Sequence, residues 1–276
     1  MPTITVAGAS LYYETTGPAG DPVVLVHGSW VDHHSFDRLL VPLAQSLQVL
    51  TYDRRGHGRS TGPARTHPVR DDARDLAGLL ESADFYPVHL VAHSYGGAVA
   101  FRLAVDRPEL VRSVCVHEAP FVGLLGDDPA TAGEAERVLA VLRSLQATAR
   151  AGDAEGAARG IADAFSLQPG AWDRLPEAVR TTFLLHVDRW CEEYDDPEAL
   201  RPDPRELSDL LVPTLLTQGA QSPPFLHRIT AALAGSLRNG TVLTLSEAGH
   251  VPQLTDPLEY AGLLGTFLLE RNVPVT

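Results

Sequence analysis

The sequence predicts an α/β fold, in which a mostly parallel sheet carries helices on both faces and a helical segment is inserted near the middle of the chain. Short apolar runs alternate with segments of helical periodicity over residues 1–120 and again from residue 213 onwards. Residues 121–207 have helical patterns without a strand pattern. A run that begins at residue 88 passes through Ser94 and its small neighbours directly into a helical pattern. Such alternation implies right-handed crossovers between parallel strands.

Before residue 121, strands and helices follow one another at short intervals. The run at 22–26 is apolar throughout, as expected of a central strand covered on both faces. In the helical pattern at 71–81, Leu76, Leu79 and Leu80 share one face. The expected strands lie at 3–6, 11–14, 22–26, 49–52, at the run from residue 88 and at 111–116, and the expected helices at 35–47, 71–81 and 98–104.

The inserted segment and the last part of the chain complete the predicted architecture. Helices are expected in the insertion at 130–150, 153–165 and 176–193, and Pro197, Pro202 and Pro204 mark its end. The α/β pattern then resumes with strands at 213–217 and 241–245 and helices at 224–237 and 258–270. We predict a core of residues 1–120 and 208–276 and a helical cap of residues 121–207 over the carboxyl edge of the sheet.

The composition of the chain excludes several classes of protein and partner. A chain of 276 residues with 44% hydrophobic and 21% charged residues is typical of a globular protein with a full core. A net charge of −13 argues against a nucleic acid or an anionic membrane as partner. With only Cys115 and Cys191, no disulfide framework is implied. Without a signal-like or membrane-spanning apolar run, we expect a cytoplasmic protein. Whether it forms a homodimer is left open.

Ser94 lies in the pattern A-x-S-x-G, with Ala92 in place of the usual first glycine and Gly96 at its end. A serine at a sharp strand-to-helix turn has a strained backbone and an exposed hydroxyl, and the turn needs small neighbours because strand and helix approach closely. The alternative is an ordinary strand–turn–helix with a capping serine.

Four segments in this order resemble the α/β-hydrolase fold family over essentially the whole chain. They are His27-Gly28, residues 53–60 (D-R-R-G-H-G-R-S), the turn at Ser94 and Gly249-His250-Val251-Pro252. The resemblance implies the α/β-hydrolase fold, with a mostly parallel eight-stranded sheet. It also implies a nucleophilic serine, an acid and a histidine in that chain order.

His250 is the expected general base, because a serine hydroxyl needs a neighbouring imidazole to take its proton. The resemblance favours it over the other histidines. His57, His89 and His117 occupy turn or strand contexts and are expected to be packed or capping. His93 adjoins the nucleophile, but neighbouring side chains on a sharp turn are expected to point apart.

Glu118 is the expected acid of the triad. Many members of the family carry Asp in the loop after the strand at 213–217, where this chain has Ser222, which cannot stabilise an imidazolium by charge. Glu118 ends the strand expected beside that of Ser94, and parallel strands lie about 4.8 Å apart. Its carboxylate is therefore expected to reach His250. The alternative is that Glu118 only caps a loop.

Two backbone N–H groups are expected to form the oxyanion hole, those of Ser29 and Tyr95. Trp30 is expected at the entrance of the site. In the insertion, Trp190 and Tyr194 lie one helical turn apart, with His186 four residues before Trp190. This stripe is either core packing or the wall of an apolar substrate pocket.

The motif Glu118-Ala119-Pro120 resembles a branch of the family with Glu after the sixth strand, which includes hydrolases of macrolactones such as zearalenone. The leading hypothesis is a serine esterase or lactonase that needs no cofactor or metal and acts on a small hydrophobic ester or lactone. Two alternatives stay open: a C–C bond hydrolase or non-hydrolytic biosynthetic enzyme, and a ligand-binding receptor with little turnover.

Overall fold

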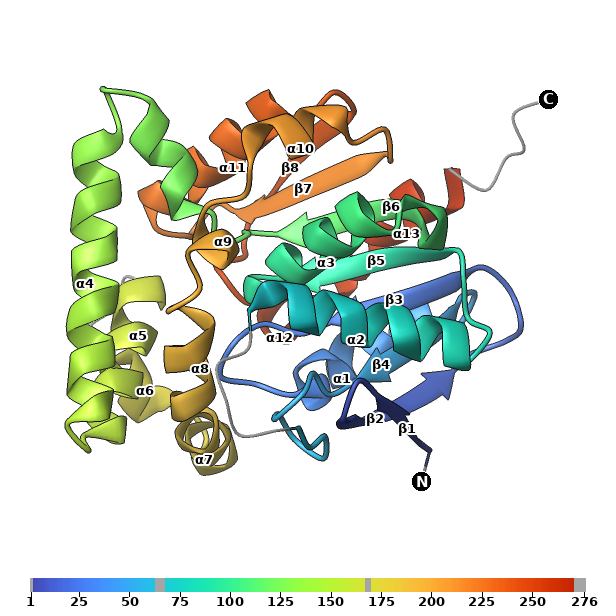
Figure 1. The fold of residues 1–276 in the computed structure, drawn as a ribbon, viewed down its shortest axis with the longest axis horizontal. Coiled ribbons are helices and arrows are strands. Elements are labelled where there is room, and N and C mark those ends of the chain that lie inside the picture. Colours follow the sequence, from blue (N-terminus) through green and yellow to red (C-terminus); the bar gives the residue numbers. More distant parts are fainter. Residues whose placement is uncertain (1, 63–67, 167–169, 271–276) are drawn as a thin grey trace.

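The computed structural model describes residues 2–62, 68–166 and 170–270, and over these residues it contains one sheet of eight strands. The strand order is β1-β2-β4-β3-β5-β6-β7-β8. β1 pairs antiparallel with β2 and β2 antiparallel with β4, while every other neighbouring pair is parallel. The strands are β1 Thr3–Val6, β2 Ala9–Thr16, β3 Pro22–Val26, β4 Gln48–Tyr52, β5 Val88–His93, β6 Val111–His117, β7 Thr214–Gly219 and β8 Gly240–Leu245. The predicted fold class is confirmed (Figure 1).

Helices follow the strands and divide into those that cover the sheet and those between β6 and β7. The first group comprises η1 His33–Phe36, α1 Asp37–Leu43, α2 Val69–Ser82, α3 Tyr95–Asp106, η2 Pro108–Leu110, α11 Pro224–Ser236, α12 Pro252–Thr255 and α13 Pro257–Glu270. The second comprises η3 Val122–Asp127, α4 Ala132–Arg150, α5 Ala154–Ser166, α6 Ala171–Arg174, α7 Glu177–Leu185, α8 Val187–Glu193, α9 Pro197–Leu200 and α10 Pro204–Asp209.

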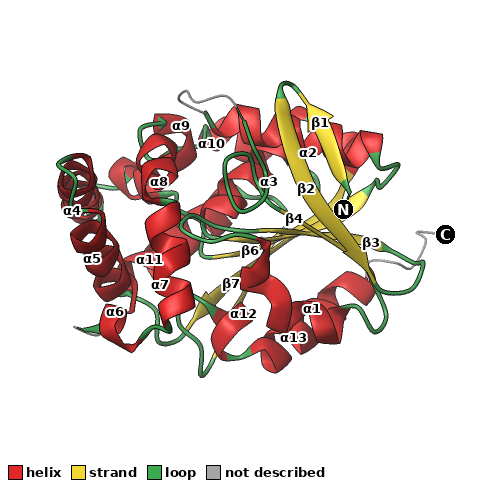
Figure 2. Ribbon diagram, turned by 90° about the horizontal axis from the view of Figure 1, so that it is seen from below, coloured by secondary structure: helices red, strands yellow, loops and turns green. Residues whose placement is uncertain are grey.

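Successive residues of β3 point to opposite faces of the sheet. Val24 and Val26 pack in the cluster that contains the apolar faces of α2, α3 and α11. Val23 and Leu25 pack in the cluster that contains those of α1 and α13. Because side chains alternate along a strand, the continuous apolar run at 22–26 serves both cores. Figure 2 shows α1, α12 and α13 on one side of the sheet and α2 and α3 on the other.

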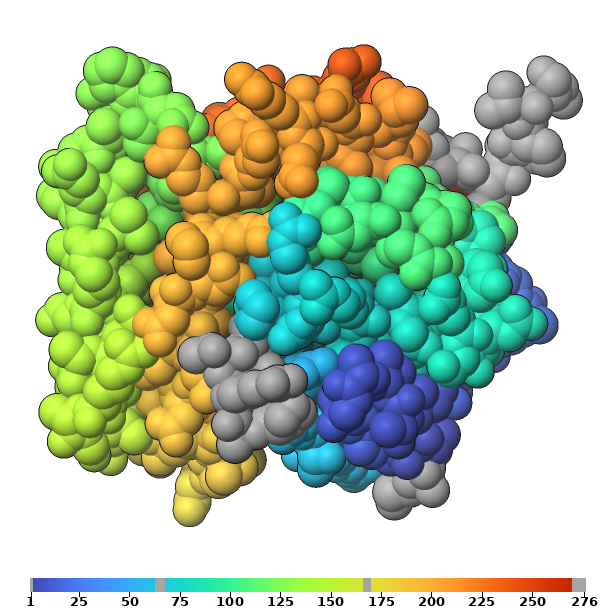
Figure 3. All heavy atoms as spheres, viewed as in Figure 1, coloured from blue at the N-terminus to red at the C-terminus, as the bar shows by residue number. Residues whose placement is uncertain are grey.

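The helices between β6 and β7, residues 122–209, are called the helical insertion below. They have a core of their own, in which Leu142, Ile161, Trp172 and Trp190 pack together with Trp30 of the sheet domain. Figure 3 shows α8 and α9 lying between α4 and α2 on one face of the molecule. The division into a core of 1–120 and 208–276 and a cap of 121–207 remains a prediction.

The structure corrects several predicted boundaries. The helix expected at 176–193 is interrupted at His186, whose N–H donates to Phe183 O at 3.1 Å, so α7 and α8 are separate helices. Of the three prolines expected near the end of the insertion, Pro197 and Pro204 are the first residues of α9 and α10, and Pro202 lies in the loop between these helices. The helix expected at 35–47 is shorter, a 3₁₀ turn followed by α1.

Within the residues that the structure describes, no helix is both long enough and apolar enough to cross a lipid bilayer.

Candidate active site

Ser94 occupies the turn between β5 and α3, at the carboxyl edge of the sheet. Its backbone has φ +52° and ψ −120°, a conformation that costs a non-glycine residue on the order of 1–3 kcal/mol. The turn brings α3 very close to β3, because a Cβ at Gly96 would lie only 2.2 Å from Val26 O. The local sequence therefore explains this turn, because a buried strand leads into small residues that let α3 approach β3.

Glu118 and His250 are in contact. His250 Nδ1 lies 2.7 Å from Glu118 Oε2, and Glu118 Oε1 accepts a hydrogen bond from the N–H of Gly219 at 2.9 Å. Glu118 follows the last residue of β6 with φ +48°, a second strained non-glycine residue at this edge of the sheet. Its N–H donates to Thr217 O at 3.2 Å, which holds the turn against β7.

The environment of Glu118 favours its charged form. Burial alone would raise the pKa of the carboxyl, but attraction to His117 and the hydrogen bond and charge of His250 outweigh burial and hold the pKa at about 2. Burial lowers the pKa of His117 to about 4, so this ring is neutral at neutral pH. At neutral pH Glu118 is thus a carboxylate, with the neutral ring of His117 close by.

His93 contacts the same group of residues, which sequence reasoning did not expect. Its Nε2 donates to His250 O at 2.7 Å, and its ring centroid lies 4.8 Å from that of His250. Burial, followed by the charge of His250, holds the pKa of His93 well below its usual range. A neutral ring that donates from Nε2 leaves Nδ1 without a proton. His93 therefore anchors the loop that carries His250.

The loop after β3 passes beside Ser94. A Cβ at Gly28 would lie 3.2 Å from Ser94 Cβ, so only glycine fits this approach comfortably. Ser29 and Trp30 follow, and Trp30 has φ +69°. Tyr95 is the first residue of α3, and the first N–H groups of a helix have no partner within the helix. The roles of Ser29 and Tyr95 as oxyanion donors remain predictions.

A cavity of about 320 Å³ lies between the carboxyl edge of the sheet and the helical insertion, and Ser94, His250 and Ser29 line it. Its exposed lining is mostly apolar. The aromatic side chains in its wall are Trp30, Phe165, Phe183, Trp190 and Tyr194. Cavities at this edge of parallel sheets are the usual ligand sites of such folds.

The three residues of the predicted stripe, His186, Trp190 and Tyr194, do not all lie at the cavity. Trp190 and Tyr194 line the cavity, and the ring centroids of Trp190 and Trp30 lie 4.7 Å apart. His186 lies outside this lining. Its Nε2 accepts from the N–H of Gly58 at 3.1 Å, and its ring stacks on His57 with centroids 4.8 Å apart. The break between α7 and α8 at His186 separates this residue from the helix that carries Trp190.

Asp32, His33 and Asp53 form the one group among the described residues whose ligand atoms are close enough to share a metal ion. Both carboxylates of this group already accept hydrogen bonds from the protein. Asp53 Oδ1 lies 2.6 Å from His33 Nδ1, Asp53 Oδ2 accepts from Arg59 N at 2.8 Å, and Asp32 Oδ1 accepts from His34 N at 3.0 Å. We assign no metal to this group.

Comparison with known proteins gives a consistent result. The model of the family described as "Alpha/beta hydrolase family" matches residues 23–263. The chain is 26% identical to the Yersinia enterocolitica protein named "Putative carbamate hydrolase RutD", over 94% of this chain and 92% of that protein. It is 27% identical to the 2-hydroxymuconate semialdehyde hydrolase of Pseudomonas sp. (strain CF600), over 92% and 89%. A thermophilic esterase from Thermogutta terrifontis superposes with a TM-score of 0.77 at 24% identity, over 98% and 97%.

Proposed function

Because the chain belongs to the alpha/beta hydrolase family, we propose that it is a serine hydrolase that cleaves a carboxylic ester or lactone of a small hydrophobic molecule. The observation that carries the proposal is the 2.7 Å contact between His250 Nδ1 and Glu118 Oε2, with His250 and Ser94 in the wall of one cavity. In this proposal Ser94 is the nucleophile, His250 the general base and acid, and Glu118 the residue that orients His250.

The contact with Glu118 has a chemical consequence for His250. A carboxylate only accepts hydrogen bonds, so Nδ1 carries the proton and Nε2 is free to take a proton from the Ser94 hydroxyl. Ser94 Oγ then attacks the carbonyl carbon and a tetrahedral oxyanion forms, facing the N–H groups of Ser29 and Tyr95. Collapse releases the alcohol, which takes the proton from His250. Water, activated by the same histidine, then cleaves the acyl-enzyme.

The cavity supports a small and mostly apolar substrate. Its volume of about 320 Å³ lies at the lower end of the range for small-molecule sites. Trp30, Trp190 and Phe183 provide aromatic wall, with the rings of Trp30 and Phe183 stacked at 5.6 Å. A lactone is an internal ester, so the same chemistry opens its ring and leaves alcohol and acid on one product.

A second candidate reaction is hydrolysis of a C–C bond, the alternative that the sequence left open. The chain also aligns over 92% of its length with a relative named 2-hydroxymuconate semialdehyde hydrolase, a name that refers to a semialdehyde and not to an ester. In that reaction the bond beside a carbonyl breaks and a carbon takes the proton. The two reactions are separated by substrate: an aryl ester with a small acyl group tests the first, and a diketone with a cleavable C–C bond tests the second.

The first test measures intact mass after treatment with a fluorophosphonate, which labels activated serines. We expect one adduct on the wild-type protein and none on Ser94→Ala, because the adduct forms on Oγ. A panel of short-chain esters and lactones then ranks substrates by kcat/KM. A folded wild-type protein that takes no label would contradict the serine mechanism. A small molecule that binds and is recovered unchanged would favour a receptor.

A further inference from the structure

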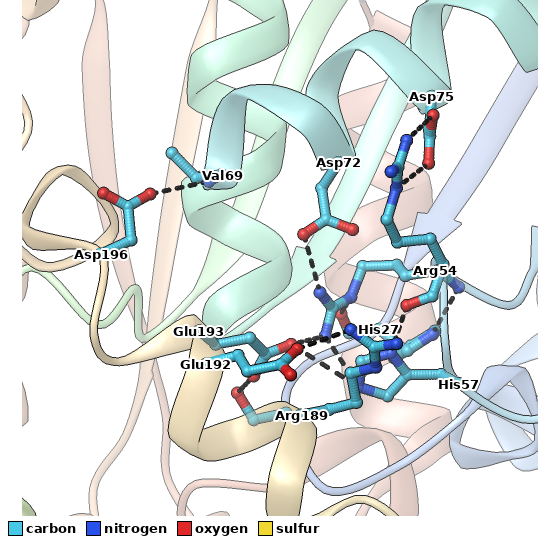
Figure 4. A network of polar contacts seen from close by, with 12 residues as sticks. His27, Arg54, His57, Val69, Asp72, Asp75, Arg189, Glu192, Glu193 and Asp196 are labelled. Carbon is cyan, nitrogen blue, oxygen red and sulfur yellow. Dashed lines mark hydrogen bonds and ion pairs between the residues drawn. The ribbon is translucent and has the colours of Figure 1, made fainter. Parts of the chain in front are cut away.

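A buried carboxylate of the helical insertion reaches the loop that carries Ser29. Glu193 is the last residue of α8 and is only 4% exposed. Its Oε2 accepts a hydrogen bond from the Ser29 hydroxyl, and its Oε1 accepts one from Arg54 Nη2. Figure 4 shows Glu193 pointing from α8 toward Arg54 and His57. A carboxylate buried in this way needs such partners, since an unpaired buried charge costs several kcal/mol.

Arg54 in turn holds the backbone that precedes Ser29. Its Nε donates to His27 O and its Nη2 to Gly28 O, each at 3.1 Å. The N–H of Arg54 donates to His27 Nε2 at 2.9 Å, so the imidazole proton is on Nδ1, which lies 2.8 Å from Gly28 O and donates to it. The Gly28 carbonyl therefore accepts two hydrogen bonds.

This carbonyl belongs to the same peptide group as the N–H of Ser29. In a planar trans peptide the C=O and N–H point in opposite directions, so anchoring the carbonyl of Gly28 fixes the direction of the Ser29 N–H. Hydrogen bonds to a carbonyl also polarise its peptide group and strengthen the N–H as a donor. The guanidinium of Arg54 lies 4.6 Å from the ring centroid of Tyr95, whose N–H is the other predicted oxyanion donor.

We propose that Glu193 is a positioning residue, through which the helical insertion sets the geometry of the predicted oxyanion hole. The inference rests on the proposed function. Glu193 fixes the side chain of Ser29 with one oxygen and Arg54 with the other. Arg54 is one of the two donors to the Gly28 carbonyl, so the Gly28–Ser29 peptide is held by Glu193 from both of its residues. The hole is then competent only when α8 is seated on the loop.

Asp72 cannot replace Glu193 in this arrangement. Its Oδ2 lies 3.4 Å from Arg54 Nη1, whereas Glu193 accepts from Nη2 of the same guanidinium and also from the Ser29 hydroxyl. Burial also raises the pKa of Asp72 to about 7, so its charge is incomplete at neutral pH. Without Glu193, Arg54 would keep Asp72 as a counter-charge, but the hydroxyl of Ser29 would lose the carboxylate oxygen to which it donates.

The experiment compares Glu193→Gln and Ser29→Ala with a matched control, Glu192→Gln. Glu192 is the preceding residue of α8 and pairs instead with Arg189 at 2.6 Å. For each variant, kcat and KM are measured with a p-nitrophenyl ester. Inhibition constants are measured for a trifluoromethyl ketone, which forms a tetrahedral oxyanion on an activated serine, and for the matching alcohol, which does not.

We expect Glu193→Gln to lower kcat by about tenfold or more while KM changes less than about threefold, because the contact is needed in the transition state. The trifluoromethyl ketone should lose affinity in parallel with kcat, and the alcohol should not. Ser29→Ala keeps the backbone N–H and should change the same quantities in the same direction. In the double variant the fold-loss of kcat should be smaller than the product of the two single losses, because both substitutions break the same Ser29–Glu193 hydrogen bond.

Kinetics of Glu193→Gln equal to those of Glu192→Gln, with an active wild-type protein, would overturn the inference and leave the proposed function intact. A lower melting temperature with unchanged kcat would overturn it as well, since Glu193 would then be structural only. If Glu193→Gln does not fold, Ser29→Ala decides, and a wild-type kcat there counts against the inference. A wild-type protein that neither takes the fluorophosphonate nor cleaves esters refutes the proposed function itself.

Discussion

The two oxygens of Glu118 have different partners, and this makes the residue sensitive to a single-atom change. Oε1 accepts from the N–H of Gly219, so in Glu118→Gln the amide oxygen would keep that place and the NH₂ group would face His250 Nδ1. His250 would then be held in the opposite tautomer, with the proton on Nε2, and could not take the proton of Ser94. We expect kcat to fall by about 100-fold or more, measured on the best ester.

Glu109→Gln, an exposed carboxylate on η2, is the matched control for Glu118→Gln and should behave as the wild-type protein does. Full activity of Glu118→Gln would show that the acid is another residue.

The stability of the fold gives a second readout of the charge on Glu118. Because the pKa of Glu118 is lowered to about 2 in the folded protein, its charge stabilises the fold fully above the ordinary carboxyl pKa of about 4.5. The difference in unfolding free energy between wild type and variant should therefore shrink as pH falls from about 4.5 toward 2.

At the scale of elements, the order of strands and helices was predictable from local patterns, because apolar periodicity and proline or glycine punctuation are properties of short segments. The turn at Ser94 is local in the same sense. The interruption at His186 was not predictable, since no proline or glycine marks it and the contact with Gly58 that accompanies it joins residues 128 positions apart. The hydrogen bond from His93 to His250 spans 157 positions and that from Ser29 to Glu193 spans 164, which explains why sequence patterns missed both.

The interruption between α7 and α8 also separates residues that the sequence placed on one stripe. Trp190 lines the cavity, so Trp190→Phe should raise KM for an aryl ester several-fold through lost ring contact, worth on the order of 1 kcal/mol. His186→Ala should leave KM unchanged but lower the unfolding free energy by about 1–3 kcal/mol, because the N–H of Gly58 loses its acceptor. Steady-state kinetics and urea unfolding of both variants check this. Equal effects on KM at the two positions would show instead that His186 and Trp190 both contact the substrate.

For the molecule as a whole, polar contacts as well as apolar packing attach the helical insertion to the sheet domain. Arg102 of α3 is 6% exposed and pairs with Glu198 of α9 at 3.0 Å and Glu206 of α10 at 2.7 Å, as well as with Asp106 of its own helix. One buried guanidinium thus joins two short helices of the insertion to the core, in addition to the contact of Glu193 with Arg54.

Removing this guanidinium takes the buried cation from three neighbouring carboxylates and leaves Arg70 beside Glu198 and Asp106. We expect Arg102→Ala to lower the unfolding free energy by about 2–4 kcal/mol, somewhat below the cost of breaking a fully buried pair because the carboxylates are partly exposed. Arg107→Ala is the matched control. Arg107 also pairs with two carboxylates, Glu81 and Glu109, but at the surface, where such pairs contribute about 1 kcal/mol or less. Urea unfolding followed by circular dichroism and by tryptophan fluorescence separates the outcomes. The three tryptophans of the chain, Trp30, Trp172 and Trp190, all lie in the hydrophobic cluster of the insertion, so fluorescence reports on that cluster. If the insertion loosens before the core, the fluorescence transition of Arg102→Ala should precede the dichroism transition. Equal losses of stability in Arg102→Ala and Arg107→Ala would show instead that packing alone attaches the insertion.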